Sequence, residues 1–288
     1  MNILVTGTTG FIGSHIMSYL NSKGYDVYGC VRSQEKKMNN KYVVCDLENE
    51  TLNFDMDIDV VIHTAAIYPF DYLKFNDFFS SNVMATRNVL RCAKMKKIKR
   101  IIYMGSVVSY GQVIGVLRED SPHNNPNHYG LTKYVAEKLI RDSGIPYYIL
   151  ILPGVVGKGC RNNWIMNTAQ KLYRNEDITY YNGKGLFNNI LEVQDLCRYV
   201  EQLLEETTES ETYLLGSNEK IRVEEVLGFL KDRLSSNSRL LCDECGRNTF
   251  YLDISKAVSN GFYSKPIKDI LEAVCEETLI REEKSGIN

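Results

Sequence analysis

The stretch NILVTGTTGFIG, residues 2–13, decides the fold of this chain. Residues 2–6 have the composition of a buried strand, and glycines follow at positions 7, 10 and 13. Gly7 permits a tight turn, Gly10 lets the backbone approach a pyrophosphate, and Gly13 lets a helix pack close to the strand. Apolar residues then recur at helical spacing over residues 11–23. A glycine triplet between a strand and an amphipathic helix predicts a dinucleotide-binding loop, with the phosphates at the N-terminus of the helix.

The alternation of strand and helix continues through the first half of the chain and then changes. Further strands are predicted at residues 27–31, 42–45, 60–63, 100–104 and 146–152, with helices at about 77–96 and 128–141. This order is typical of βαβ units and predicts an α/β fold, a doubly wound parallel sheet of Rossmann type. The second half mixes helices near 163–174, 195–205, 223–234 and 266–277 with short strands at 189–193 and 212–215. We expect a dinucleotide-binding domain over residues 1–157 and a smaller mixed α/β substrate-binding region over residues 158–288, some of whose later segments return to the core.

Composition and charge exclude several classes of function. The chain has 288 residues, of which 44% are hydrophobic and 24% charged, as in an ordinary globular protein. A net charge of −2 argues against a nucleic-acid-binding surface. No apolar run approaches the ~18–20 residues of a membrane helix, and the N-terminal residues lack the features of a signal peptide. We therefore expect a cytoplasmic protein that binds neither nucleic acid nor membrane.

Eight cysteines are scattered along the chain, and only Cys242 and Cys245 lie close together. A zinc site would need two further ligands at similar spacing, and the sequence offers none. A disulfide framework is not expected in a cytosolic chain of this size. We expect no metal site.

The second predicted strand bears on the choice of cofactor. An acidic side chain at its end would bind the ribose hydroxyl of NAD, but Val31 occupies that position and Arg32 follows. An arginine there can pair with a 2′-phosphate, which favours NADP and leaves NAD possible. Asp46, after the third strand, is a candidate for binding the adenine amino group of the cofactor. The alternative is that it serves as a helix cap or turn residue.

Beyond this loop, a set of motifs resembles the extended short-chain dehydrogenase/reductases, and within them the NAD-dependent epimerase/dehydratase family. The motifs are residues 6–13, Asp46-Leu47, His63-Thr64-Ala65-Ala66, Asn82, Ser106, Tyr129-Gly130-Leu131-Thr132-Lys133, and the segments 153–157, 189–196, 213–217 and 252–257. They cover nearly the whole chain in the family's order. The resemblance implies Ser106, Tyr129, Lys133 and Asn82 as catalytic residues. It implies cofactor contacts from Gly7, Thr9, Gly10, Phe11, Ile12, Gly13, Arg32, Asp46, Leu47, Thr64, Ala65, Ala66, Tyr129, Lys133, Pro153 and Val155.

Two Tyr-x-x-x-Lys pairs compete on one predicted helix, Tyr129 with Lys133 and Tyr134 with Lys138. Tyr134 shares an apolar stripe with Leu131, Val135 and Leu139, so we interpret it as a packing residue. Tyr129 and Lys133 lie on roughly the opposite side of the helix, one turn apart. An ammonium beside a phenol stabilises the phenolate, so Lys133 is predicted to lower the pKa of Tyr129. Tyr129 could then exchange a proton while hydride moves, with Ser106 hydrogen-bonded to the substrate oxygen.

The residues after Ser106 narrow the reaction. Dehydratases that resemble this chain carry an Asp-Glu pair where it has Val107 and Val108, and neither valine can transfer a proton. Epimerisation at carbon 3 or 5 would need another acid/base pair, for which only His123 and Cys160 are candidates. What remains is a carbonyl/alcohol redox step at one carbon, catalysed by a 4-keto reductase or a 4-epimerase, and the family's substrates are most often nucleotide-sugars.

Three alternatives stay open: a reductase of a non-sugar carbonyl, a non-enzymatic NADP(H)-sensing protein of the same fold, and a structural or interaction protein. The set of Ser106, Tyr129 and Lys133 argues against the last. NADP(H)-sensing proteins generally lose the tyrosine or the lysine, and this chain keeps both. The resemblance also implies a homodimer built on the helix of Tyr129 and the long helix before it.

Overall fold

The computed structural model describes residues 1–34, 41–70, 72–206, 210–243 and 249–286. The chain divides into two compact units, neither of which is continuous in sequence. The first comprises residues 1–111, 122–151 and 197–213, and the second comprises residues 112–121, 152–196 and 214–288. The functional boundary after residue 157 stays a prediction.

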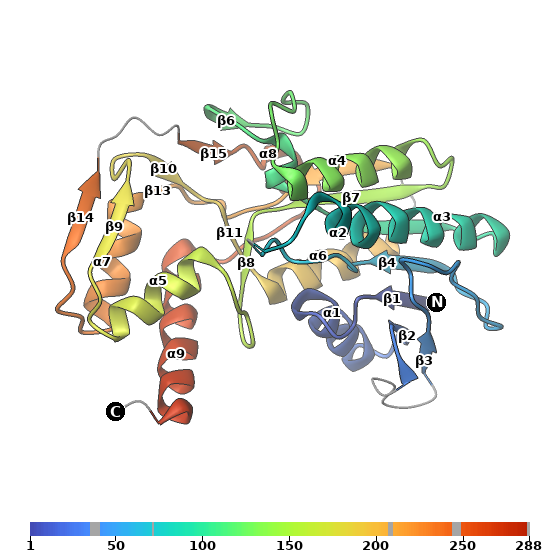
Figure 1. Cartoon of the computed structure of the whole chain (residues 1–288), viewed down its shortest axis with the longest axis horizontal. Coiled ribbons are helices and arrows are strands. Elements are labelled where there is room, and N and C mark those ends of the chain that lie inside the picture. Colours follow the sequence, from blue (N-terminus) through green and yellow to red (C-terminus); the bar gives the residue numbers. More distant parts are fainter. Residues whose placement is uncertain (35–40, 71, 207–209, 244–248, 287–288) are drawn as a thin grey trace. The chain divides into compact units, whose positions relative to one another are not determined.

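The first unit is built on a seven-stranded sheet with the order β12-β7-β5-β4-β1-β2-β3 (Figure 1). The strands are β1 (Asn2–Thr6), β2 (Asp26–Val31), β3 (Tyr42–Val44), β4 (Val60–His63), β5 (Arg100–Ser106), β7 (Tyr147–Leu152) and β12 (Glu211–Leu214). The pairs from β5 to β3 are parallel. The strand order reverses between β1 and β4, and ligands bind at such a switch point in doubly wound sheets. This topology confirms the predicted fold class.

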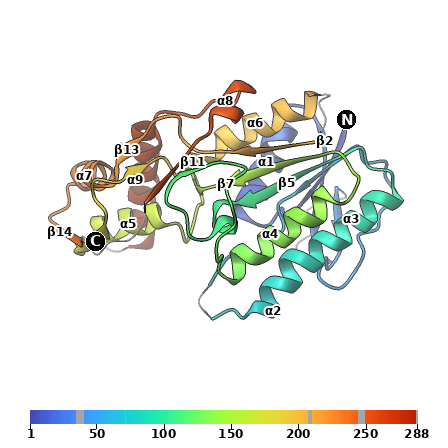
Figure 2. The same cartoon turned by 90° about the horizontal axis from the view of Figure 1, so that it is seen from above.

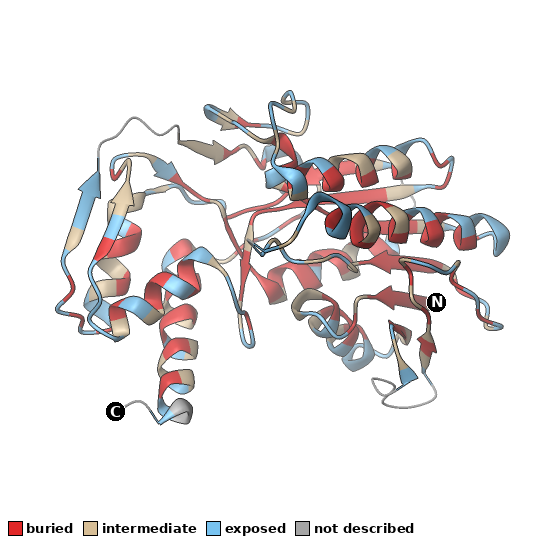
Figure 3. Cartoon of the chain, in the orientation of Figure 1, coloured by how far each residue is buried: buried red, intermediate tan, exposed pale blue. Residues whose placement is uncertain are grey.

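Helices cover both faces of this sheet, and its strands are buried between them (Figures 1, 2 and 3). They are α1 (Phe11–Ser22), α2 (Phe75–Phe78), the π-helix η2 (Phe79–Met84), α3 (Ala85–Met95), the 3₁₀-helix η3 (Val107–Tyr110), α4 (His128–Arg141) and α6 (Val193–Glu205), of which residues 197–205 belong to this unit. Figure 2 shows α3 and α4 side by side on one face, with α1 and α6 on the other. Tyr19 on α1 donates a hydrogen bond to Glu201 on α6 at 2.7 Å. The predicted helix over residues 77–96 exists as the succession α2, η2 and α3.

The described part of the second unit contains short strands and further helices. Its strands, among the described residues, are β6 (Gly115–Leu117), β8 (Gly154–Val156), β9 (Ile178–Tyr181), β10 (Leu186–Phe187), β11 (Ile190–Glu192), β13 (Ile221–Arg222), β14 (Leu240–Asp243) and β15 (Phe250–Leu252), and its helices are α5 (Trp164–Tyr173), α7 (Val223–Arg233), α8 (Ser255–Ser259) and α9 (Ile267–Ser285). The strands pair two by two, β10 with β13, β11 with β8, β14 with β9 and β15 with β6. Most of them were not predicted, because strands this short carry little periodicity. Arg174, after α5, binds Glu282 of α9 with its guanidinium at 3.0 Å.

Two sequence predictions concern features outside the sheet. Within the described ranges, no helix combines the length and apolar character needed to cross a membrane. Cys242 is exposed on β14, whereas Cys245 lies outside the described residues. The cytoplasmic location stays a prediction.

Candidate active site

The glycine loop lies at the switch point, where the loop after β1 meets the loop after β4. Gly7 has a φ of +72°, and a Cβ there would lie 2.8 Å from backbone atoms of Ala65 and from the Thr64 hydroxyl. A Cβ at Gly13 would lie 2.4 Å from the carbonyl oxygen of Gly7. Thr64 ties the two loops together, because its hydroxyl donates a hydrogen bond to the Thr6 carbonyl at 2.7 Å. Side chains at Gly7 or Gly13 would push these segments apart, so both glycines are required for the close approach.

The N-terminus of α1 has the form that a bound phosphate needs. Gly10 is its N-cap residue, makes no side-chain capping bond and donates its backbone N–H to the Gly7 carbonyl at 2.9 Å. Phe11 and Ile12 begin the helix, so their backbone N–H groups have no partner one turn earlier within it. Thr9 is exposed in the same turn. This cradle of glycine backbone and helix N-terminus fits the diphosphate of a dinucleotide.

Arg32 follows β2 and is exposed, but it already has a partner. Its guanidinium lies 2.9 Å from the Glu48 carboxylate, which also accepts a hydrogen bond from the Ser81 hydroxyl at 2.7 Å. Asp46 accepts hydrogen bonds from the Glu48 backbone and from the Asn49 amide, the latter at 2.8 Å. These are the contacts of a turn residue, and the contact of Asp46 with the adenine stays a prediction.

Leu47 and Ala66 complete the predicted contacts around the switch point. Leu47 is buried, and its carbonyl accepts a hydrogen bond from the buried Asn88 amide of α3 at 2.9 Å. Ala66 follows Ala65, whose backbone N–H donates to the Thr6 hydroxyl at 3.2 Å. The third strand and the β4 loop are thus held in place by side chains of their own unit.

Helix α4 turns polar side chains toward the core. Asn127 caps its start by accepting a hydrogen bond from the Gly130 backbone at 2.8 Å. Lys133 is buried, donates its ammonium to the Met104 carbonyl at 2.6 Å and lies 4.2 Å above the centre of the Tyr103 ring. The other residues of this buried face are Gly130, Thr132, Ala136, Glu137 and Ile140.

Tyr129 and Ser106 form the contact that the predicted chemistry requires. Their side chains are hydrogen-bonded to each other, and the Phe78 ring packs edge-on against the Tyr129 ring at 6.1 Å. Burial raises the pKa of Tyr129 to about 12, and the Ser106 hydrogen bond opposes this shift. The prediction that Lys133 lowers this pKa is wrong for the structure as it stands. Desolvation of the phenol is the largest cause of the shift, and Lys133 is not among the causes.

Asn82 lies in the π-helix and is buried rather than exposed on a helix surface. Its amide nitrogen donates to the Thr132 hydroxyl at 2.9 Å, and its amide oxygen accepts from the Ile67 backbone at 3.1 Å. Asn82 therefore connects α4 to the loop that follows β4, next to the residues of the predicted catalytic set.

The two remaining acid/base candidates are held in other roles. The His123 ring stacks between Tyr110 at 4.5 Å and Tyr134 at 3.7 Å, and its Nδ1 donates to the Ser109 carbonyl at 2.7 Å. Tyr134 is therefore a packing residue, as its stripe predicts. Cys160 is buried in the second unit, and burial raises the pKa of its thiol to about 11, so the thiol is neutral at physiological pH.

Tyr103 and Glu137 are two further candidates for the site that no sequence motif indicated. Both are buried, and among the described residues neither the Tyr103 hydroxyl nor Glu137 Oε1 has a hydrogen-bond partner. Glu137 comes four residues after Lys133, so a helical wheel would have placed both charges on the buried face of α4.

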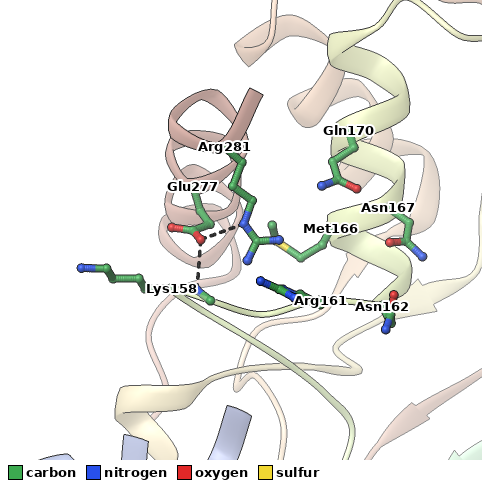
Figure 4. A pocket seen from close by; sticks show the side chains of 9 residues that line it. Lys158, Arg161, Asn162, Met166, Asn167, Gln170, Glu277 and Arg281 are labelled. Carbon is green, nitrogen blue, oxygen red and sulfur yellow. Dashed lines mark hydrogen bonds and ion pairs between the residues drawn. The ribbon is translucent and has the colours of Figure 1, made fainter. Parts of the chain in front are cut away.

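The remaining predicted contacts, Pro153 and Val155, lie in the second unit. Val155 is buried in β8, where its carbonyl accepts a hydrogen bond from the Asn163 amide at 3.4 Å. The same unit contains a cavity of about 520 Å³ between α5, α9 and the loop before α5 (Figure 4). Lys158 and Arg161 line it, together with Arg281, which is paired with Glu277 at 2.9 Å. None of the predicted catalytic residues lines this cavity.

Comparison with known proteins places this geometry in a family. Residues 3–216 match the model of the NAD dependent epimerase/dehydratase family. A Methanocaldococcus jannaschii protein, provisionally named UDP-glucose 4-epimerase, is 29% identical, with 94% of this chain and 95% of the relative covered. A Streptomyces dTDP-4-dehydro-6-deoxy-D-allose reductase is 25% identical, with 88% of each chain covered.

A solved structure shows the same fold. The UDP-glucuronic acid 4-epimerase of Bacillus cereus in complex with NAD has a TM-score of 0.83 and 24% identity, covering 98% of this chain and 99% of that one. Together with the glycine cradle, the match to the family model supports a nicotinamide dinucleotide as the cofactor. The chain therefore belongs to the NAD-dependent epimerase/dehydratase family, which confirms the predicted family, fold class and nicotinamide-dependent enzymatic activity.

Proposed function

We propose that this protein is a nucleotide-sugar 4-epimerase, which oxidises the hydroxyl at carbon 4 of the sugar and reduces the resulting ketone from the opposite face. One observation carries the proposal: the hydroxyls of Ser106 and Tyr129 are hydrogen-bonded to each other beside the end of β5, with Lys133 one turn farther along α4. Two hydroxyls so placed can hold a single substrate oxygen, which a redox step at one carbon requires. The relatives named above act on sugars linked to nucleotides, which supports that substrate class.

The roles of the chain's own groups follow from their positions. Bound nicotinamide would supply the acceptor and the donor of hydride. The Tyr129 hydroxyl would take the proton of the sugar hydroxyl during oxidation and return it during reduction, while Ser106 would hold the same oxygen by a hydrogen bond. With a raised pKa, Tyr129 is neutral at physiological pH and is ready to donate. Its role as a base requires the Lys133 ammonium to stabilise the phenolate.

The residues that follow Ser106 disfavour dehydration. Val107 and Val108 begin the 3₁₀-helix η3 and carry no proton-transferring group. His123 is enclosed by two aromatic rings, and burial lowers its pKa, so it is neutral. None of these three residues is therefore suited to transfer a proton at a second carbon of the sugar.

A 4-keto reductase is the second candidate, and the neutral Tyr129 favours it. Reduction alone needs a proton donor and never needs the phenolate, so a phenol with a pKa of about 12 suits this direction. The Streptomyces reductase named above shows that relatives with this activity exist.

We propose NADP as the preferred dinucleotide, with NAD as the alternative that the solved neighbour carries. Arg32 supports NADP, because its exposed guanidinium can bind a 2′-phosphate and Val31 cannot bind a ribose hydroxyl. Glu48 competes with a phosphate for the same guanidinium and therefore limits the preference.

A panel of substrates tests the function. UDP-glucose, UDP-N-acetylglucosamine and UDP-glucuronic acid are incubated with the protein and NAD or NADP, and the products are separated by anion-exchange chromatography. An epimerase interconverts each accepted sugar with its 4-epimer without net change in absorbance of the reduced cofactor. A reductase instead consumes NADPH or NADH stoichiometrically with a nucleotide-4-ketosugar. If the protein does neither with any member of the panel, nucleotide-sugars are not its substrates.

We also propose a homodimer formed through α3 and α4, which lie side by side on one face of the sheet. The apolar stripe of α4 does not face the core of its own unit: Leu131 is 38% exposed, and Tyr134, Val135 and Leu139 are partly exposed. An apolar stripe on such a helix suits a twofold partner surface. Light scattering should give about twice the 33.0 kDa of one chain. A mass of one chain at micromolar concentration contradicts the proposal.

A further inference from the structure

Glu137 is a buried carboxyl group that the proposed reaction leaves without a role. It lies on α4 one turn after Lys133 and is 2% exposed. The backbone N–H of Ser106 donates a hydrogen bond to its carboxylate, and the Ser109 hydroxyl nearby also favours the charged form. Glu137 Oε1 has no hydrogen-bond partner among the described residues. The group thus approaches the predicted catalytic serine from the inside of the unit.

The backbone is shaped so that this carboxyl can reach its place. A Cβ on Gly105 would lie 3.0 Å from Glu137 Oε1 and 2.7 Å from a methyl group of Ile151. Any side chain at position 105 would push against the carboxyl group and the next strand at once. Gly105 therefore permits the carboxylate to lie directly under the backbone of Ser106.

A buried carboxylate with one oxygen lacking a hydrogen bond is unstable unless a cation compensates it. Lys133 is the cation on the same buried helix face, and residues four apart on a helix are neighbours. Burial lowers the pKa of Lys133, and the negative charge of Glu137 opposes that decrease. Burial raises the pKa of Glu137, and the positive charge of Lys133 opposes that increase. Each group therefore favours the charged form of the other.

We propose that Glu137 is a positioning residue of the catalytic centre: it fixes the backbone of Ser106 from behind and keeps the ammonium of Lys133 charged for Tyr129. Loss of the carboxylate would leave Lys133 in an apolar setting with only the Met104 carbonyl and the Tyr103 ring as partners. The amine would then lose its proton at lower pH and could no longer stabilise a phenolate.

Other titratable groups face this pair and have to be considered. They are Arg141 and Tyr129 on α4, Tyr103 on β5 and His63 on β4. Burial and the Lys133 charge lower the pKa of His63 to about 3, and burial raises the pKa of Tyr129 to about 12. Burial also raises the pKa of Tyr103. These three groups are therefore neutral between pH 5 and 9, and Arg141 favours the charged form of Glu137.

The kinetic test compares Glu137→Gln with the unmutated enzyme, and it rests on the proposed function. Glutamine keeps the shape and an acceptor oxygen for the Ser106 N–H but lacks the charge. We expect nearly unchanged KM and cofactor affinity. The pH above which kcat falls should move down by about one unit or more, because an adjacent opposite charge shifts a pKa by roughly 1–3 units.

A matched control removes a buried carboxylate elsewhere. Glu282 is also 2% exposed, and it pairs with Arg174 in the second unit. Glu282→Gln should leave the pH profile of kcat in place, whatever it does to the melting temperature. A Glu137→Gln profile that superimposes on those of the control and the unmutated enzyme overturns the proposal. If Glu137→Gln does not fold, the infrared titration of Lys133→Met described next decides the proposal.

An infrared titration needs no substrate, so it separates this proposal from the proposed function. The carbonyl band of a neutral carboxyl group is followed between pH 5 and 9 in the unmutated protein, Glu137→Gln and Lys133→Met. The band of Glu137 should be absent from Glu137→Gln. In Lys133→Met it should persist to higher pH, because loss of the cation raises the pKa of the carboxyl group. A titration unaffected by Lys133→Met shows that the two groups are not coupled and overturns the proposal.

Discussion

Replacing Tyr129 by phenylalanine removes one hydroxyl from the proposed site and little else. The ring stays packed against Phe78, and the glycine loop that binds the dinucleotide is untouched. The lost interaction is the hydrogen bond with Ser106. We therefore expect Tyr129→Phe to fold, still to bind cofactor and to lose turnover.

The two effects differ enough in size to be separated. A neutral hydrogen bond contributes about 0.5–1.5 kcal/mol to stability, and removal of a desolvated hydroxyl offsets part of that loss. For a chain of this length such a change moves the melting temperature by no more than roughly 5 °C. Loss of general acid/base catalysis lowers kcat by about 10²–10⁴, equivalent to roughly 3–5 kcal/mol of activation free energy. The defect should therefore appear in kcat and hardly in stability.

Three measurements make the assay decisive: kcat for the accepted nucleotide-sugar, the dissociation constant of the reduced cofactor by fluorescence, and the melting temperature. Tyr134→Phe is the matched control, since Tyr134 stacks on His123 at 3.7 Å and phenylalanine keeps the ring. Its kcat should stay within about twofold, as volume-conserving changes are well tolerated. If Tyr134→Phe abolishes turnover while Tyr129→Phe does not, the assignment of the catalytic tyrosine is wrong by five residues.

The pH dependence of Tyr129 gives an independent check. Its pKa in the folded protein is raised to about 12 from 10 in the unfolded chain. Stability from this group is therefore fully present below pH 10 and is lost as the pH rises from 10 toward 12. In an ultraviolet titration of the cofactor-free protein, the tyrosinate absorbance of the unmutated protein is compared with that of Tyr129→Phe. The two should not differ below pH 10, because Tyr129 is not yet ionised. A tyrosinate that appears near pH 8 and is lost in Tyr129→Phe would restore the original prediction of a lowered pKa.

Three further predictions concern the cofactor and the core. Arg32→Ala should weaken NADPH binding about ten- to a hundredfold and NADH binding little, and Glu48→Gln should strengthen NADPH binding; equal effects on both cofactors in titrations would refute a role in phosphate binding. Gly13→Ala should abolish dinucleotide binding measured by calorimetry, because its Cβ would lie 2.4 Å from the Gly7 carbonyl; nanomolar to micromolar binding in a folded variant would contradict this. Burial lowers the pKa of His63 to about 3 in the folded chain. The contribution of neutral His63 to the free energy of unfolding is therefore intact above about pH 6.5 and is lost as the pH falls toward 3. The full loss is roughly 4–5 kcal/mol at 1.36 kcal/mol per pH unit. Urea unfolding at pH 7 and pH 4.5 should show about 2.7 kcal/mol of that loss, for the roughly 2 units between 6.5 and 4.5, and His63→Asn should show less of it.

The sequence predicted the elements of the first unit with small errors, because their patterns are local. Strand β4 and helix α4 begin and end at the residues predicted from the sequence, and the structure shows that Asn127 caps the start of α4. The glycines of the loop were assigned individual roles, and the structure shows why Gly7 and Gly13 have room for no side chain. Most strands of the second unit are too short for a periodic signal and were missed.

The electrostatic character of the site was decided by tertiary structure alone. The i, i+4 spacing of Tyr129 and Lys133 is a property of the sequence, but the partner of the lysine is Met104, which comes from another element. Likewise, an exposed Arg32 is readable from the sequence, whereas its pairing with Glu48 depends on how the segment after β3 returns to β2.

The sequence by itself determined which groups we propose as functional: the glycine loop, the Ser106, Tyr129 and Lys133 set, and valines in place of a dehydratase's acids. These follow from residue type and spacing along one strand or helix, which are fixed before the chain folds. Only the tertiary structure decided the charge states, since a pKa depends on the burial and neighbours that distant segments provide. Glu137 illustrates the difference: the sequence places it four residues after Lys133, and only the packing of α4 against β5 and η3 turns it into a buried charge beneath Ser106.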